Sequence, residues 1–135
     1  MKIIKFFAFS VVNVPACQRD VAYVPQPVVT AAVGASQNLT CESNGKPLTS
    51  CLWTHSANDT RQIIVVDQQV VANEGRTGVD GIDFAGNSSD FQAGKCAINI
   101  ESITETDLGL WACNLVTADS TVFGGAVHVG KSVSG

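Results

Sequence analysis

Apolar and polar residues alternate with a period of two along several short stretches of the chain. The alternation is clearest over residues 37–42, 51–55, 96–101, 111–115 and 121–129. Successive side chains of a strand point to opposite faces, so each stretch predicts a β-strand with one buried and one exposed face. Short strands separated by turns rich in Gly, Asn, Asp and Ser are typical of a two-sheet, all-β sandwich.

The alternation also predicts which side chains face the core. Leu39 and Cys41 are inward in the first stretch, and Cys51 and Trp53 are inward in the second. Further along the chain, the predicted inward residues are Cys96, Ile98, Ile100, Trp111, Cys113 and Leu115. Cysteine, tryptophan and branched aliphatic residues are among those most often buried, so the predicted inner faces form a consistent core.

Three stretches fit the alternation less well. Residues 63–66, Ile-Ile-Val-Val, are apolar on both faces, so either Ile63 with Val65 or Ile64 with Val66 points outward. Residues 74–94 hold five glycines and are expected to contain two more strands of uncertain bounds. Residues 21–30 predict an irregular edge strand, because two prolines interrupt them, on the sheet that contains residues 37–42 and 96–101.

The run Asp107-Leu108-Gly109-Leu110-Trp111-Ala112-Cys113, together with Cys41 and Trp53, resembles the immunoglobulin superfamily. In that fold a cysteine, a strand tryptophan and a D-x-G-x-aromatic-x-C corner follow in this order. Cys113 follows Cys41 by 72 positions, a spacing that suits a variable-type domain of about nine strands. Trp111 stands where the family has a corner tyrosine, and its indole cannot reproduce the contact of the phenol.

A second resemblance concerns the remaining cysteines. Gly94-Lys95-Cys96-Ala97-Ile98, with Cys51 just before the strand tryptophan, is similar to immunoglobulin modules of invertebrate secreted and cell-surface proteins. The two resemblances imply the disulfides Cys41–Cys113 and Cys51–Cys96. Phe123-Gly124-Gly125-Ala126 is similar to the glycine bulge at which variable domains pair, although glycines that relieve a strand edge explain it equally well.

Composition bounds the size and the partners of the protein. The 135 residues, of which 45% are apolar, suffice for one domain, expected at residues 17–130 with a short tail at 131–135. A net charge of −4, with only eight Lys and Arg spread along the chain, indicates neither nucleic-acid nor anionic-lipid binding. No later stretch reaches the ~18 apolar residues that a membrane span needs.

Residues 1–16 predict a short secretory signal peptide, and a buried N-terminal strand is the alternative. The five cysteines of the chain favour an oxidising, extracellular compartment. Three glycosylation sequons begin at Asn38, Asn58 and Asn87, and polar turns can also produce such triplets by accident. Cleavage after Ala16 would leave Cys17 at the mature N-terminus, where it could link two chains in a homodimer.

The sequence contains no convincing catalytic pattern. His55 and His128 are expected to be surface histidines, because oxidised cysteines leave no thiolates to complete a metal site. Glu105 and Asp107 lie at the predicted corner, where an aspartate tethers its own turn. No Gly-x-Ser-x-Gly elbow or phosphate-binding glycine loop is present. We therefore expect neither a cofactor nor a metal, and no enzymatic activity.

The resemblance implies a secreted or surface-displayed module that binds another protein in cell adhesion or immune-type recognition. The alternatives are one module of a larger membrane-anchored adhesion or guidance receptor and, with least support, a small secreted enzyme. A glycan on Asn38 would block one sheet, so the binding face is expected on the other. Its outward residues are expected to be Leu52, Thr54, Ile63, Val65, Ala112, Asn114 and Val116.

Overall fold

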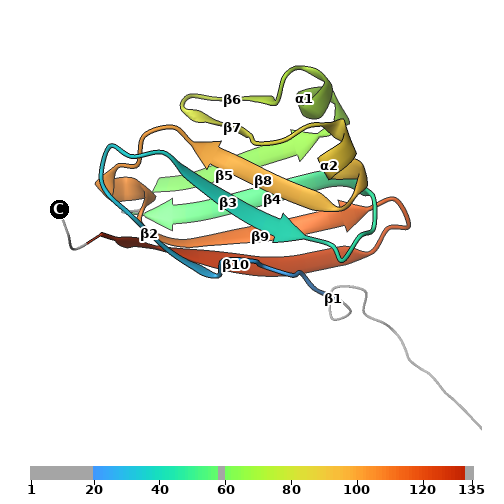
Figure 1. The fold of residues 1–135 in the computed structure, drawn as a ribbon, viewed down its shortest axis with the longest axis horizontal. Helices are drawn as coiled ribbons and strands as arrows, with labels where there is room; N and C mark the ends of the chain where they lie inside the picture. The colour runs from blue at the N-terminus through green and yellow to red at the C-terminus, as the bar shows by residue number, and fades with distance from the viewer. Residues whose placement is uncertain (1–19, 58–59, 133–135) are drawn as a thin grey trace, which may run out of the picture.

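The computed structural model describes residues 20–57 and 60–132, which form two β-sheets packed face to face (Figure 1). The predicted signal peptide, Cys17 and Asn58 lie outside the described residues. Within them there are ten strands, two short helices and one 3-10 helix. The strands are β1 (Asp20–Val21), β2 (Val28–Ala31), β3 (Gln37–Glu42), β4 (Leu48–Ala57), β5 (Thr60–Asp67), β6 (Arg76–Val79), β7 (Ile82–Phe84), β8 (Lys95–Ile100), β9 (Gly109–Thr117) and β10 (Val122–Lys131); the helices are α1 (Gln68–Ala72), α2 (Ser88–Gln92) and the 3-10 helix Glu105–Asp107.

One sheet has six strands and the other has four. The six-stranded sheet runs β1-β10-β9-β4-β5, with β2 also paired to β10, and the four-stranded sheet runs β3-β8-β7-β6. Consecutive strands such as β3 and β4 therefore lie in different sheets, which is the crossing pattern of a Greek-key sandwich. The prediction of a two-sheet, all-β sandwich is confirmed.

The core lies between the sheets and is made by the side chains that the alternation placed inward. Leu39, Trp53, Ile98, Trp111 and Leu115 are all 0–1% exposed. In β5 the register decides between the two possible faces, because Ile64 lies opposite Trp53 in β4. Ile64 and Val66 are accordingly buried, and Ile63 and Val65 are exposed.

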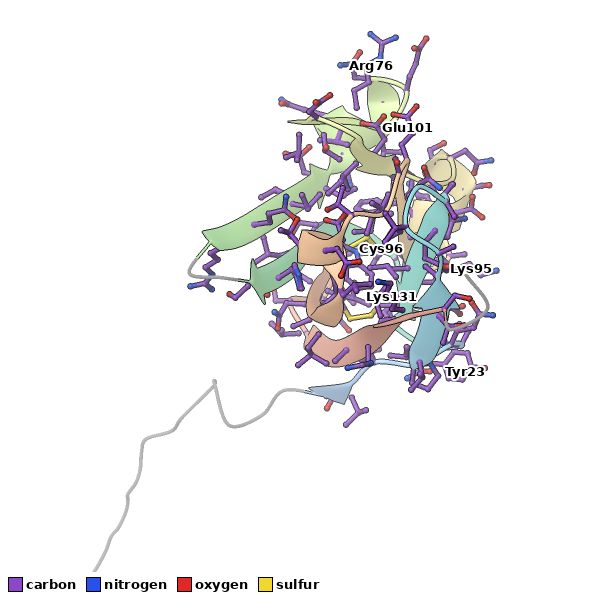
Figure 2. The ribbon with its side chains drawn as sticks, turned by 90° about the vertical axis from the view of Figure 1, so that its left-hand side faces the viewer. Tyr23, Arg76, Lys95, Cys96, Glu101 and Lys131 are labelled. Atoms are coloured by element: carbon purple, nitrogen blue, oxygen red, sulfur yellow. A yellow bond between two sulfur atoms is a disulfide. The ribbon has the colours of Figure 1, made fainter. Side chains whose placement is uncertain are left out.

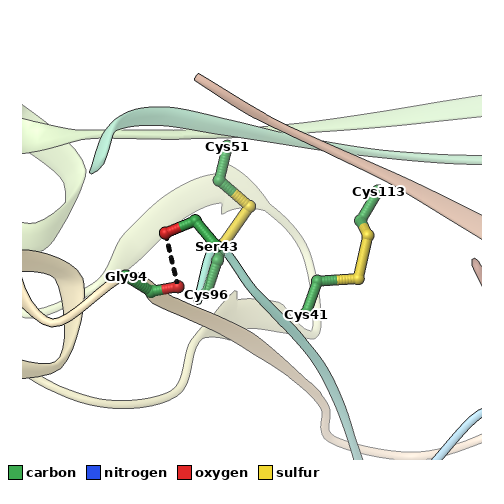
Figure 3. The surroundings of a disulfide bond; sticks show 6 residues. All are labelled: Cys41, Ser43, Cys51, Gly94, Cys96 and Cys113. Atoms are coloured by element: carbon green, nitrogen blue, oxygen red, sulfur yellow. Dashed lines mark hydrogen bonds between the residues drawn. A yellow bond between two sulfur atoms is a disulfide. The ribbon is translucent and has the colours of Figure 1, made fainter. Parts of the chain in front are cut away.

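Two disulfides join the sheets side by side (Figure 3). Cys41 of β3 is bonded to Cys113 of β9, and Cys51 of β4 is bonded to Cys96 of β8. Cys41 and Cys96 are direct neighbours across β3 and β8, so the two bridges start from adjacent positions of one sheet. All four cysteines are at most 1% exposed, which shields both bonds from reductants in solvent.

The corner before β9 is held by a hydrogen bond that the sequence did not predict. Trp111 Nε1 donates to the carbonyl oxygen of Asp107 at 2.8 Å. The Asp107 carboxylate in turn accepts from the backbone N–H and the hydroxyl of Thr104, at 2.8 and 3.0 Å. The indole therefore does supply a polar tether at this corner, where it replaces the tyrosine of related domains.

We expect Trp111→Phe to lower the free energy of unfolding by about 1–2 kcal/mol more than Trp53→Phe does. Both indoles are 0% exposed, and both substitutions remove the same ring volume. Trp53 Nε1 has no hydrogen-bond partner among the described residues, whereas Trp111 Nε1 has one. Urea unfolding of the two variants isolates the tether, and equal losses would show that it contributes nothing.

Two short helices lie just before the glycine-rich region at residues 74–94 and near its end. Among the described residues no strand pairs with the outer edge of β5; the chain instead continues into α1, whose N-cap Asp67 accepts from Val70 N at 2.9 Å through its carboxylate. Helix α2 has Asn87 as its N-cap, whose side chain and that of Asp90 form a reciprocal capping box. Between the helices, β6 and β7 form a hairpin in the four-stranded sheet. Of the two strands expected between residues 74 and 94, neither is hydrogen-bonded to β5.

The N-terminal strands lie on the opposite sheet from the one that we expected. Both β1 and β2 pair in parallel with β10, and only an isolated bridge from Tyr23 to Glu42 joins this segment to β3. The register between β9 and β10 is continuous, so Gly124-Gly125 forms no bulge there. A Cβ on Gly125 would lie 2.9 Å from Val24 Cγ2 and 3.2 Å from Ala22 Cβ. Gly125 therefore allows the N-terminal segment to pack closely against β10.

Candidate functional site

The seven residues predicted as an interface form one continuous surface on the outer face of the six-stranded sheet. The pairing of β5, β4 and β9 places Val65, Leu52 and Asn114 in one row across the sheet. Ile63, Thr54 and Ala112 form the next row. We call the set the outer patch; it comprises Leu52, Thr54, Ile63, Val65, Ala112, Asn114 and Val116.

The outer patch has no charged residue, and five of its seven residues are apolar. Ile63 and Val65 are 50% and 48% exposed, and Leu110, which lies at the start of β9, is 58% exposed. The nearest charged residues on β5 are Arg61 and Asp67, one at each end of the strand. Apolar side chains that are this exposed and this close together are more typical of an interaction surface than of ordinary protein surface.

A hollow of about 260 Å³ opens at one end of the outer patch. Its walls include Thr54, Ser56 and Arg61 on one side and Leu110 and Ala112 on the other. Among the described residues, no carboxylate forms an ion pair with Arg61. The hollow thus combines an apolar wall, a hydroxyl and an available guanidinium, a combination suited to the side chains of a protein partner.

His55 lies beneath this hollow and is buried, so the prediction of a surface histidine is wrong for it. Its ring is 3% exposed and is stacked on the indole of Trp111 with the ring centres 4.5 Å apart. Nδ1 and Nε2 lie 2.8 Å from the carbonyl oxygens of Leu110 and Thr106, respectively. A neutral imidazole carries one N–H and donates to one of these oxygens, whereas the protonated ring donates to both. His55 therefore links β4 to the backbone of Thr106 in the 3-10 helix and of Leu110 in β9.

The two histidines do not form a shared site. His128 is exposed on the outer side of β10, where it is paired with Leu110, whereas His55 is on the inner side of β4. The sequence did carry a signal for the burial of His55. It stands two positions after Trp53, and the same period of two that placed Trp53 in the core places His55 there as well.

The four-stranded sheet presents a more polar outer face. Figure 2 shows Lys95, the first residue of β8, and Glu101, which directly follows β8, projecting from this side of the molecule. Asn38 is exposed on β3, and its Oδ1 accepts from Asn99 Nδ2 at 2.7 Å. Asn87 uses its Oδ1 to cap α2 through Ser89 N and Asp90 N. In both asparagines the Nδ2 atom, to which a glycan would be attached, is separate from these contacts.

The turns at residues 43–47 and 117–121 meet at one end of the sandwich. Lys46 Nζ lies 3.0 Å from Asp119 Oδ2 in an ion pair across the two turns. The hydroxyl of Thr117, followed by Lys46 and Thr121, holds the pKa of Asp119 well below its usual range. Both side chains are about half exposed, so this pair orders the loops more than it stabilises the domain.

Two further features of the described residues bear on the type of protein. No helix among them could cross a membrane, since α1 and α2 are each five residues long. Nor do the described residues gather three or more His, Cys, Asp or Glu side chains in a group that could hold a metal ion.

Comparison with models of known protein families finds a match, which confirms the variable-type immunoglobulin sandwich predicted from the sequence. The family model described as immunoglobulin V-set domain matches residues 23–130, which include both disulfides, the corner and every strand from β2 to β9. No curated protein matches the sequence significantly.

Proposed function

Because this chain belongs to the immunoglobulin V-set family, whose members are generally non-catalytic recognition modules, we propose that it binds another extracellular protein through the outer patch. The observation that carries the proposal is the exposed, uncharged surface formed by Leu52, Ile63 and Val65 on adjacent strands. The proposed setting is cell adhesion or immune-type recognition outside the cell. Two buried disulfides are compatible with that compartment, because such bonds persist where the environment is oxidising.

The two sheets differ in the way that this proposal requires. Asn38 lies on the outer face of the four-stranded sheet, and a glycan there would keep a large partner away from that face. The two sequon asparagines within the described residues, Asn38 and Asn87, both lie outside the six-stranded sheet. A partner that buries Ile63 and Val65 would gain hydrophobic stabilisation without first having to desolvate a charge.

We expect Ala112→Glu to abolish binding and Ala97→Glu to leave it unchanged. Ala112 and Ala97 are both partly buried alanines on central strands, but they face outward from opposite sheets. The measurement is a screen of the multimerised domain against a panel of secreted and cell-surface ectodomains, followed by affinity measurements for each binder. A charge at Ala112 must be desolvated when the partner binds, which raises the dissociation constant by about 100-fold or more.

Two controls decide the result. Asn38→Gln removes the predicted glycan and should leave the partner and its affinity unchanged. Thermal unfolding must show that both glutamate variants are folded. Binding that survives Ala112→Glu but is lost in Ala97→Glu would move the site to the four-stranded sheet and overturn the proposal.

A further inference from the structure

The strand β5 has an unpaired outer edge. It is the last strand of the six-stranded sheet and pairs only with β4. After Asp67 the chain turns into α1, and the next strand, β6, joins the other sheet. Figure 2 shows β5 at the margin of the six-stranded sheet. Within the described residues, no backbone hydrogen bond joins β5 to any strand other than β4.

This edge also lacks the features that normally keep strands apart. Edge strands of natural proteins are usually short, or are interrupted by proline, lysine or a bulge. β5 has eight residues, Thr-Arg-Gln-Ile-Ile-Val-Val-Asp, with no proline, glycine or lysine. Its register with β4 is continuous from Ser50 opposite Asp67 to Ala57 opposite Thr60, so no bulge bends it away. A long, regular, β-branched edge of this kind is ready to pair with another strand.

The charges at the two ends of β5 indicate what that other strand is. Arg61 and Asp67 lie three positions before and three positions after Ile64. When two copies of β5 run antiparallel about a two-fold axis at Ile64, Arg61 of each copy lies opposite Asp67 of the other. We propose that β5 pairs with β5 of a second copy of this chain in this register, so that the two six-stranded sheets become one continuous sheet.

The proposed register satisfies the side chains on both faces. Ile63 of one copy lies opposite Val65 of the second copy on the outer face, and cross-strand pairs of this kind stabilise a sheet. On the inner face, Ile64 lies opposite Ile64 of the second copy. Asp67 uses one carboxylate oxygen to cap α1, through Val70 N at 2.9 Å, and its other oxygen can accept from the guanidinium. Parallel pairing would instead place like charges side by side.

The inference goes beyond the proposed function. Pairing at the edge uses the backbone of β5 and leaves Leu52 and Ala112 exposed on the outer face. It would also bring two outer patches next to each other on one surface. A dimer can therefore form whether or not the outer patch binds a different protein, and the two proposals fail independently.

The first experiment measures the monomer–dimer equilibrium by sedimentation equilibrium, using the full secreted chain with Cys17→Ser to remove any covalent link through that residue. The unmodified edge should dimerise. Arg61→Glu places two carboxylates together at each end of the interface and should raise the dimer dissociation constant at least about tenfold. Arg76→Glu is the matched control, because Arg76 is also an exposed arginine near the start of its strand, β6, but lies on the other sheet, so the substitution should have no effect.

A second variant removes a charge from the interface without adding one, so that a weaker dimer cannot be ascribed to unfolding. Asp67→Asn retains a residue that caps α1 well but removes the charge opposite Arg61, so it should weaken the dimer without unfolding the domain. A protein that stays monomeric up to about 0.2 mM overturns the proposal. So does a dimer that Arg61→Glu and Asp67→Asn leave unchanged.

The second experiment tests the register. Ile63→Cys and Val65→Cys proteins, both with Cys17→Ser, are oxidised separately and as a mixture. Residues directly opposite each other in an antiparallel pair are close enough for a disulfide, whereas diagonal neighbours are about 7–8 Å apart and are not. The mixture should therefore form disulfide-linked dimers and each protein alone should form few. Equal cross-linking in all three samples would show random collision or another register and would contradict the proposal.

Discussion

Replacing Cys51 and Cys96 together by alanine is expected to lower the free energy of unfolding by about 4 kcal/mol. The bridge closes a loop with a sequence separation of 45 residues, so its loss releases much conformational entropy in the unfolded chain. The separation for Cys41–Cys113 is 72 residues, and loop-closure entropy depends only weakly on length. Replacing Cys41 and Cys113 by alanine should therefore cost about the same, within roughly 0.5 kcal/mol.

Urea unfolding of the two double variants is the measurement. Loss of either bridge alone should leave a folded domain with a lower midpoint. A loss of less than about 1 kcal/mol for the Cys51/Cys96 variant would show that this bridge constrains the chain little. A much larger loss for the Cys41/Cys113 variant would show that packing around that bridge, rather than loop entropy, dominates its contribution.

The substitution Gly94→Ala is expected to lower the free energy of unfolding by about 4 kcal/mol, because it adds steric overlap to backbone strain. Gly94 has φ of +89°, a conformation that disfavours any residue with a Cβ. The added Cβ would lie 2.3 Å from Ser43 Oγ and 2.8 Å from the carbonyl oxygen of Lys46. Ser43 cannot easily move, because its backbone N–H donates to the carbonyl of Gly94 at 2.9 Å and its hydroxyl also points to that oxygen (Figure 3).

Gly45→Ala is the matched control for this prediction. Gly45 has φ of +91°, and no atom lies within 4 Å of the position of its added Cβ. It should therefore show the backbone strain alone, about 1–3 kcal/mol. Thermal or urea unfolding of both variants separates the two effects, and equal losses would mean that the contact between Gly94 and Ser43 relaxes without cost.

These two predictions concern the part of the sandwich that holds the outer patch in place. β4 contributes Leu52 and Thr54 to the patch, and the same strand carries Cys51 on its inner face. Gly94 ends the turn after α2 and leads into β8, which carries Cys96. Loosening either position would let β4 move more freely relative to the opposite sheet. A binding surface on a rigid sheet loses less conformational entropy on association, so both variants should also weaken partner binding.

Much of the fold could be predicted because single residues carried its strongest signals. The corner run from Asp107 to Cys113, and the alternation that places Cys51 and Trp53 on an inner face, sufficed to predict the fold class and most of the strands. The helices were missed for a physical reason. Each has five residues, too few for an apolar period of 3.6 to appear, and only the caps at Asp67 and Asn87 indicate them in the sequence.

The candidate site was predictable in its members but not in its geometry. Leu52, Thr54, Ala112, Asn114 and Val116 follow from alternation, because inner and outer faces are fixed once one inward residue is known. Hydrogen-bond partners could not be predicted in this way, since they depend on which segments the fold brings together. Neither the bond from Trp111 to the carbonyl of Asp107 nor the two carbonyl contacts of His55 has a signature in the local sequence.

The sequence by itself determined the two-sheet architecture, the inward cysteines and tryptophans and the family, because a period of two and a few spaced residues are local properties of the chain. Only the tertiary structure decided that Ile63 and Val65, rather than Ile64 and Val66, face solvent, since both faces of β5 are equally apolar and packing against Trp53 breaks the tie. It also decided that β1 and β2 join β10 and that, among the described residues, no strand is hydrogen-bonded to the outer edge of β5. Strand order is set by the packing of the whole sandwich, and no single segment contains that information.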